Sequence, residues 1–303
     1  MKIAVLSGTP EANYLEDGVI AGCISLLGAQ NVDYAPYKHH LSGGRPAQYP
    51  ERTCWYPGLP SAKSYHSIVN SLDTYDLTVI GYPSSIETAG LLQEAAAIAS
   101  RAICIVGEDA PVFRIIESLH PTGLKFIRER AHLPNDPLIR DCPLPYNAID
   151  LPAKTPWLKK DIDLLWVGAP HHGRAEYIDV IREFKQATII TNSIAHADYL
   201  KLLNRTKLCV VLHGAGRQTY RHLEAAAAGC CVLEQGPTSW DPLYPSGSET
   251  PFETPEQLRQ TLVAWTTKLS KDDVAQVSGD NLREALIRDH THVARAAQIL
   301  AQL

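Results

Sequence analysis

Strand-like and helix-like segments alternate along this chain, and this alternation limits the folds open to it more than any other feature. Short, continuously apolar runs occupy residues 2–7 (KIAVLS), 76–82 (DLTVIGY) and 207–212 (KLCVVL). Longer segments between such runs, for example residues 14–27 and 86–100, read as helices. Strands that are apolar throughout are typical of parallel sheets covered by helices on both faces. The sequence therefore predicts an α/β fold.

A proline-rich stretch separates two halves that follow the same pattern. Residues 134–156 (PNDPLIRDCPLPYNAIDLPAKTP) interrupt the alternation, as is typical of a domain boundary. A chain of 303 residues is long enough for two domains of about 150 residues each. We predict two Rossmann-like domains, residues 1–155 and 156–303. Helices over residues 255–269 and from residue 281 to the end are expected to close the chain.

Composition narrows the classes of function. The net charge of −5 argues mildly against a nucleic-acid partner. No run approaches the roughly 20 apolar residues that a membrane-spanning helix needs, and the first ten residues lack the features of a signal peptide. The seven cysteines form no CxxC pair, which indicates buried, reduced thiols. We expect a soluble, cytoplasmic protein.

The segment over residues 212–229 (LHGAGRQTYRHLEAAAAG) carries the most chemistry. A strand ends, glycines allow a ligand to approach the backbone, and a helix begins with free N–H groups that suit a pyrophosphate. Arg217 and Arg221 could contact phosphate oxygens, and Glu224, in an otherwise apolar helix, needs polar partners such as sugar hydroxyls. The other donor-binding candidates in this segment are His213, Gly214, Ala215, Gly216, Gln218, Thr219 and Tyr220. The alternative is a tight turn in which Glu224 pairs locally with Arg221 or Arg217.

The same segment resembles the C-terminal domain of GT-B glycosyltransferases, and in particular the group similar to spore-maturation-type glycosyltransferases. In that group an R-x-x-E-a-x-A-x-G helix follows the phosphate loop, and Arg221, Glu224 and Gly229 match it. The segments DIDLLWVGAPHHGRAEYIDVI, FETPEQLRQTL and HTHVARAAQIL look similar to the opening strand and the closing helices of that domain. In the first half, ICIVGEDA, LKFIRERAHLP and CPLPYNAI are similar as well. The resemblance covers about two thirds of the chain.

The resemblance implies a nucleotide-sugar donor, such as a UDP-sugar, bound mainly by the second domain without a metal or other cofactor. It implies that Glu224 holds the ribose hydroxyls and that Gly168, Arg174, the glycine loop and Arg217 or Arg221 hold the diphosphate. Asn192, Ser193 and Ile194 would meet the base. The acceptor hydroxyl, on a small molecule, a glycan or a macromolecule, would lie on the side of the first domain.

One departure bears on the stereochemistry. Retaining families of this clan carry a Glu-x7-Glu pair, and its first glutamate would fall on Gly216. The clan favours retention, but the missing glutamate leaves retention or inversion open.

Catalysis requires stabilisation of the leaving diphosphate, for which Arg174, Arg217 and Arg221 are the candidates. It also requires a proton acceptor, and Asp17 and Asp109 follow strands of the first half. A role at the start of a helix is the favoured alternative for Asp17.

Three other features leave the function open. The long segment over residues 39–64 looks like a loop or lid, and its Trp55 and Tyr56 could stack on an acceptor or pack inward. His171 and His172 are adjacent and have no third partner at metal-ligand spacing, so we predict no metal site. The rival functions are a non-catalytic nucleotide- or sugar-binding protein, an NAD-type oxidoreductase, which the absence of GxGxxG disfavours, and a glycosyltransferase acting on modified nucleic acid.

Overall fold

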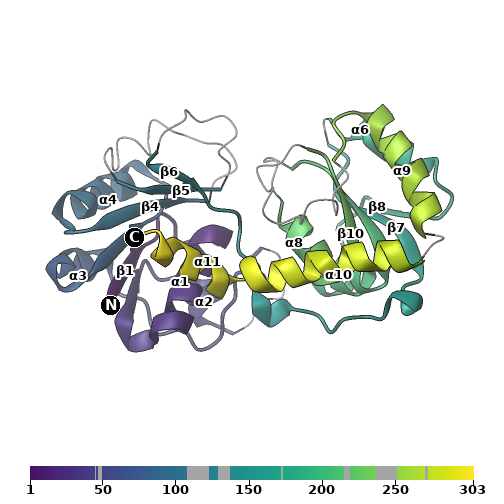
Figure 1. The fold of residues 1–303 in the computed structure, drawn as a ribbon. Coiled ribbons are helices and arrows are strands. Elements are labelled where there is room, and N and C mark those ends of the chain that lie inside the picture. The colour runs from purple at the N-terminus through teal and green to yellow at the C-terminus, as the bar shows by residue number, and fades with distance from the viewer. Residues whose placement is uncertain are drawn as a thin grey trace. The chain divides into compact units, whose positions relative to one another are not determined.

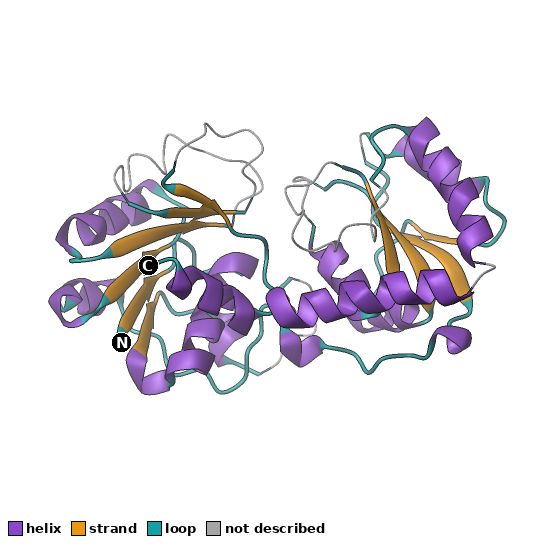
Figure 2. Cartoon of the chain, viewed as in Figure 1, coloured by secondary structure: helices purple, strands orange, loops and turns teal. Residues whose placement is uncertain are grey.

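The structure is a computed structural model that describes residues 1–44, 46, 50–107, 123–128, 137–171, 173–214, 219–236, 251–269 and 272–303. The chain divides into two compact units. Unit 1 comprises residues 1–149 together with residues 290–303, and unit 2 comprises residues 150–289. In both units, strands form a central sheet flanked by helices (Figures 1 and 2).

Unit 1 is built on a parallel sheet with the strand order β2-β1-β3-β4-β5-β6. Every neighbouring pair of these strands is parallel, as the apolar runs of the sequence predict. The strands are β1 (Ile3–Leu6), β2 (Val32–Ala35), β3 (Leu77–Ile80), β4 (Ala102–Val106), β5 (Lys125–Ile127) and β6 (Ile139–Asp141).

Successive residues of a strand point to opposite faces of the sheet, and helices cover both faces. Ala4 and Leu6 of β1 share a core cluster with residues of α3 and α4, such as Ile68 and Leu92. Ile3 and Val5, which are equally buried, therefore point to the other face. The helices of unit 1 are α1 (Tyr14–Leu27), α2 (His39–Ser42), α3 (Tyr65–Val69), α4 (Ile86–Ile98) and α11 (His292–Ala301).

Unit 2 contains a second parallel sheet with the order β10-β9-β7-β8. Its strands are β7 (Ile162–Val167), β8 (Ala187–Ile190), β9 (Thr206–Val211) and β10 (Cys231–Glu234). Its helices are α6 (Ala175–Arg182), α7 (His196–Asn204), α8 (Tyr220–Ala227), α9 (Pro255–Leu269) and α10 (Asp272–Asp289). The main core joins Leu164, Trp166 and Val210 of the sheet to Ile178 of α6 and Leu262 of α9.

The end of the chain differs from the sequence prediction. One helix was expected from residue 281 onward, within the second domain, but α10 ends at Asp289 and α11 begins at His292. Between them the chain runs beside Tyr146, whose N–H donates to the carbonyl of His290 and whose carbonyl accepts the N–H of His292. Thr291 then caps α11 through its hydroxyl. The last fourteen residues thus belong to unit 1, and the division between the units falls at 149/150 rather than at 155/156.

Candidate functional site

The carboxyl ends of the strands in unit 2 meet at one edge of the sheet, because all four strands run parallel. Such edges are where open α/β sheets bind ligands. Gly168 follows β7, and His213 follows β9. Residues 192–194 follow β8, with Asn192 and Ser193 exposed and Ile194 half-buried. The structure therefore brings these described candidates together at one edge of the sheet.

Arg174 ties two loops of this edge together. It is 5% exposed, and its Nε donates to the carbonyl oxygen of His213 at 2.8 Å. A second nitrogen, Nη2, donates to the same oxygen, while Nη1 donates to the carbonyl oxygen of Ala169 at 3.1 Å. The guanidinium thus joins the loop after β7 to the loop after β9. Its position fixes the two backbone segments to which the sequence assigns the diphosphate.

Arg174 also has a second cation as a neighbour. Burial, together with the charge of Arg221, lowers the pKa of Arg174 to about 10. Arg174 is still protonated at neutral pH, so two guanidinium groups repel each other at this edge. Arg221 lies in the first turn of α8 and is half-buried. A bound anion would relieve this repulsion, and the N-terminus of α8 favours an anion as well.

Glu224 is buried within unit 2 and is paired with a histidine that the sequence did not suggest. Its side chain is 2% exposed, and its Oε1 lies 2.6 Å from Nε2 of His196, which is itself 5% exposed. The two residues belong to α8 and α7, so the contact joins two helices. Among the described residues, Glu224 forms hydrogen bonds and ion pairs with His196 and not with Arg221, the local partner that the sequence left open.

The start of α8 is held by a second histidine–carboxylate pair. Thr219 is the N-cap, and its N–H lies 3.3 Å from Nδ1 of His222, three residues later. The other ring nitrogen of His222 lies 3.3 Å from Oε2 of Glu234 at the end of β10. Both side chains are buried. Tyr220, the first residue of α8, is also buried, which makes its side chain part of the core. The helix N-terminus is thus anchored to the sheet beneath it.

Several predicted residues cannot be placed. Ala215, Gly216, Arg217 and Gln218 of the glycine loop lie outside the described residues, and so does Asp109. Gly214 is described and half-buried.

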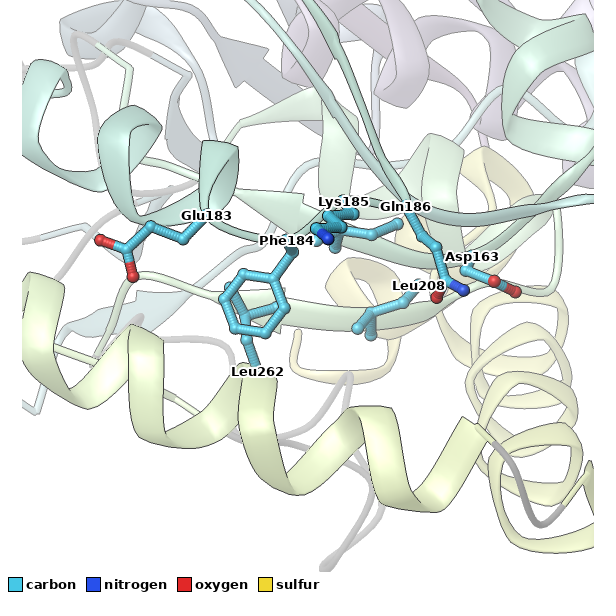
Figure 3. Close-up of a pocket in the computed structure, with 8 residues that line it drawn as sticks. Asp163, Glu183, Phe184, Lys185, Gln186, Leu208 and Leu262 are labelled. Atoms are coloured by element: carbon cyan, nitrogen blue, oxygen red, sulfur yellow. The ribbon is translucent and has the colours of Figure 1, made fainter.

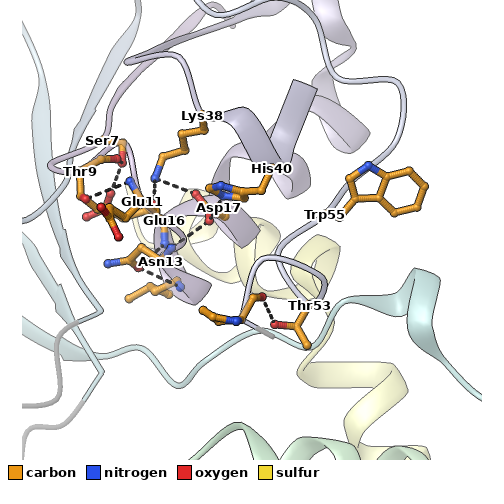
Figure 4. A network of polar contacts seen from close by, with 12 residues as sticks. Ser7, Thr9, Glu11, Asn13, Glu16, Asp17, Lys38, His40, Thr53 and Trp55 are labelled. Carbon is orange, nitrogen blue, oxygen red and sulfur yellow. Dashed lines mark hydrogen bonds and ion pairs between the residues drawn. The ribbon is translucent and has the colours of Figure 1, made fainter. Parts of the chain in front are cut away.

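In unit 1, Asp17 lies at the centre of a buried polar network (Figure 4). Its Oδ1 lies 2.9 Å from Nζ of Lys38, and its Oδ2 lies 2.8 Å from Nε2 of His40. The backbone N–H of Asn13, the N-cap of α1, donates to Oδ2 at 2.9 Å. Asp17 and Lys38 are completely buried. Burial by itself raises the pKa of Asp17, but Lys38 and His40 outweigh it and hold this pKa below its usual value.

Glu16, next to Asp17, connects the loops that follow two strands. Its Oε2 accepts the hydroxyl of Ser7 and, at 3.1 Å, the N–H of Gly8, both directly after β1. Its Oε1 accepts the N–H of Tyr82, after β3, at 2.9 Å. Glu16 is completely buried, and burial raises its pKa from 4.5 to about 7 against the opposing effects of Lys38 and these hydrogen bonds.

The sequence contained partial signals for these contacts. Glu16 and Asp17 are the two acids of an otherwise apolar helix, which indicates that they need buried partners. No local pattern pointed to Lys38, His40, His196 or Glu234, because each meets its partner across the fold.

Trp55 and Tyr56, in the segment over residues 39–64, have structural contacts within unit 1. Tyr56 is buried and packs against the ring of His292, with centroids 4.9 Å apart. Trp55 is half-buried, and its Nε1 donates to the carbonyl of Gly43 at 3.2 Å.

A cavity of about 350 Å³ lies elsewhere in unit 2 (Figure 3). Its lining includes Asp163 and Leu164, near the start of β7, and residues 183–186, which precede β8. It therefore opens at the amino ends of the strands, away from the candidate site.

Across the described ranges, no group of three or more His, Cys, Asp or Glu residues could hold a metal ion. None of the described helices combines the length and the apolar character needed to cross a bilayer.

Comparison with known proteins covers both halves of the chain. Residues 156–301 match the family described as glycosyl transferase-like. No curated protein matches the sequence. Among solved structures, Anabaena HepE in complex with UDP and glucose is similar to the whole chain, with a TM-score of 0.61, 15% identity and 100% of both chains covered.

Two further structures resemble the chain over its full length. An alpha-glucosyltransferase in complex with UDP-glucose and DNA has a TM-score of 0.60 at 11% identity, with 100% of this chain and 98% of that chain covered. Sucrose-phosphate synthase from Thermosynechococcus elongatus has a TM-score of 0.56 at 14% identity and the same coverage. At these identities the likeness shows a shared fold.

Proposed function

We propose that this chain, which has the GT-B fold and whose residues 156–301 match the family described as glycosyl transferase-like, transfers a sugar from a UDP-sugar to an acceptor hydroxyl. The observation that carries the proposal is a pair of cations at the carboxyl edge of a parallel sheet: Arg174, which binds the carbonyls of the loops after β7 and β9, and Arg221, in the first turn of α8. Such a site suits the diphosphate of a nucleotide sugar.

Glu224 would bind the ribose of the same donor. His196 contacts Oε1, whereas Oε2 has no hydrogen-bond partner among the described residues and is not one of their fully buried, unpaired polar atoms. A buried carboxylate with one accessible oxygen is suited to accept a ribose hydroxyl, since such a bond replaces the water that burial removes. The predicted base contacts, Asn192 to Ile194, follow strand β8 of the same sheet.

In the reaction, the bond between the anomeric carbon and the diphosphate oxygen breaks while a bond from the acceptor oxygen forms. Negative charge accumulates on the departing diphosphate, and Arg174, Arg221 and the N-terminus of α8 would stabilise it. Arg217 is a further candidate for this role.

The proton of the acceptor must also be removed. Asp17 is completely buried, and three donors already surround its carboxylate, so we assign it to the structure of unit 1. We propose that an oxygen of the departing phosphate accepts the proton, which requires attack from the face of the leaving group and retention of configuration. Asp109 stands as the alternative base.

The choice of UDP is supported by similar structures. HepE was solved with UDP and glucose, and the alpha-glucosyltransferase with UDP-glucose. The second of these also held DNA, but the net charge of −5 of the present chain disfavours a polyanionic acceptor.

Calorimetric titration with UDP tests the donor site. UDP is expected to bind, and Glu224→Ala is expected to weaken binding about tenfold or more, because hydrogen bonds to charged groups contribute roughly 1.5–3 kcal/mol. Glu176→Ala, which removes an exposed acid of α6, serves as the control and should leave affinity unchanged. Equal affinity of the wild type and Glu224→Ala would remove the ribose contact from the proposal.

Release of sugar from UDP-glucose, followed with and without acceptor mixtures, separates an enzyme from a protein that only binds nucleotides. We propose that transfer needs no metal ion, and expect it to persist in EDTA. Loss of activity in EDTA that a divalent ion restores would contradict this part of the proposal.

A further inference from the structure

The first residue of α7 connects two parts of the candidate site. His196 directly follows the loop after β8, where the predicted base contacts lie. Its Nε2 reaches across to Oε1 of Glu224 on α8, at 2.6 Å. The side chains are 5% and 2% exposed, so water competes little for this hydrogen bond. The contact therefore fixes the Glu224 carboxylate relative to the loop after β8.

The two oxygens of Glu224 differ in their surroundings. Oε1 is hydrogen-bonded to His196, whereas Oε2 makes no hydrogen bond within the described part of the chain and is not fully buried. The terminal torsion of a glutamate is broad and has no strong intrinsic preference. A donor at Oε1 consequently selects one orientation of the carboxylate plane, and with it the direction of Oε2.

We propose that His196 is a positioning residue: its Nε2–H holds Oε1 of Glu224 so that Oε2 meets the ribose hydroxyls of a nucleoside diphosphate. The inference rests on the proposed function, because it assumes that Glu224 binds ribose. Preorganisation of this kind lowers the ordering cost of binding. Through this preorganisation, His196 would help to determine the affinity for ribonucleotides without contacting the ligand itself.

Tyr199, one turn later in α7, provides a matched control. Its ring centroid lies 6.2 Å from that of His196, and its hydroxyl is fully buried with no hydrogen-bond partner in the described ranges. Burial raises its pKa, and the charge of Glu224 raises it further. Tyr199→Phe therefore changes the same buried region without removing a hydrogen bond from Glu224.

The test compares UDP with 2′,3′-dideoxy-UDP by calorimetry, because only UDP offers hydroxyls to Glu224. The wild type should bind UDP at least about tenfold more tightly than the dideoxy analogue. His196→Phe, which keeps a ring but removes the donor, should reduce the affinity for UDP to nearly that of the analogue. The affinity of His196→Phe for the analogue should equal that of the wild type, and this result would also show that the site is folded. His196→Gln, which retains an N–H donor, should restore part of the preference, and Tyr199→Phe should keep all of it.

The outcomes separate the inference from the proposed function. If the wild type prefers UDP and His196→Phe keeps that preference, the positioning role is wrong while the ribose contact stands. If the wild type binds both nucleotides equally, the ribose contact fails, and the inference fails with it. A general loss of affinity for both nucleotides in a folded His196→Phe would identify His196 as a structural residue and overturn the proposal.

A measurement on the unmutated ring covers the case in which His196→Phe does not fold. Long-range ¹H–¹⁵N spectra, with the His196 signals assigned by their loss in His196→Gln, report which ring nitrogen carries hydrogen. Hydrogen on Nε2 is expected, since this atom must donate to Glu224. Hydrogen on Nδ1 alone would overturn the proposal.

Discussion

Arg221 is the residue through which catalysis can be separated from binding. Its interaction with the diphosphate should strengthen as the leaving group gains charge, and only such differential binding lowers the barrier. Arg221→Ala should reduce single-turnover transfer by about a hundredfold or more, with a smaller effect on donor affinity. Arg221→Lys should recover part of the rate, because an ammonium cannot reproduce the guanidinium fork. A transfer rate within a few-fold of the wild type would move the role to Arg174 or Arg217.

Glu16 gives the stability of unit 1 a defined pH dependence. Its pKa is about 7 in the folded protein, compared with its ordinary value of 4.5. The folded state therefore binds more protons between these values, so the contribution of Glu16 to stability is complete below pH 4.5 and is lost as the pH rises through 7. Glu16→Gln cannot titrate. The free energy of unfolding of the wild type minus that of this variant should fall by up to about 3 kcal/mol from pH 4.5 to above pH 7.

Urea unfolding across this pH range measures the difference, with the exposed Glu176→Gln as the control. Asp17 does not interfere, because its pKa is lowered and its contribution is lost only as the pH falls through that depressed value. A difference between wild type and Glu16→Gln that is independent of pH would mean that Glu16 stays ionised throughout.

At the scale of elements, α10 packs closely on the turn that ends α8. A Cβ atom at Gly279 of α10 would lie 2.6 Å from the carbonyl oxygen of Gly229, a backbone atom that cannot give way easily. Gly279→Ala should therefore lower the free energy of unfolding by about 1–3 kcal/mol. The matched control is Gly90→Ala in α4, where a Cβ meets nothing within 4 Å. The control should raise stability by about 0.5–1 kcal/mol, and chemical denaturation compares the two. Similar effects of both changes would disprove the close approach.

At the scale of the whole molecule, the last helix completes the unit in which the chain began. A Cβ at Gly22 of α1 would lie 2.2 Å from the carbonyl oxygen of His292 and 2.7 Å from Cβ of Ala296, both in α11. Deleting residues 290–303 should therefore reduce hydrogen-exchange protection in β1 and α1 and leave β7 and β9 largely protected. Gly22→Val should have the same effect in the intact chain, and loss of protection spread equally over both units would contradict this assignment.

The sequence predicted the elements and the class of fold because both depend on local pattern. Continuous apolar runs, such as residues 207–212, identify strands buried on both faces. The same reasoning identified Glu224 as a buried carboxylate, since a single acid in an apolar helix needs a polar partner.

The sequence did not identify the partners, and tertiary structure alone decided them. His196 meets Glu224 across 28 positions, and Glu16 meets the N–H of Tyr82 across 66. Arg174 binds the carbonyl of His213 through a contact between two loops. Such pairs depend on which strands are neighbours in the sheet, and on how the final helix returns to α1. Local periodicity specifies which side chains are buried, but the order of strands and helices in space specifies what each buried side chain contacts.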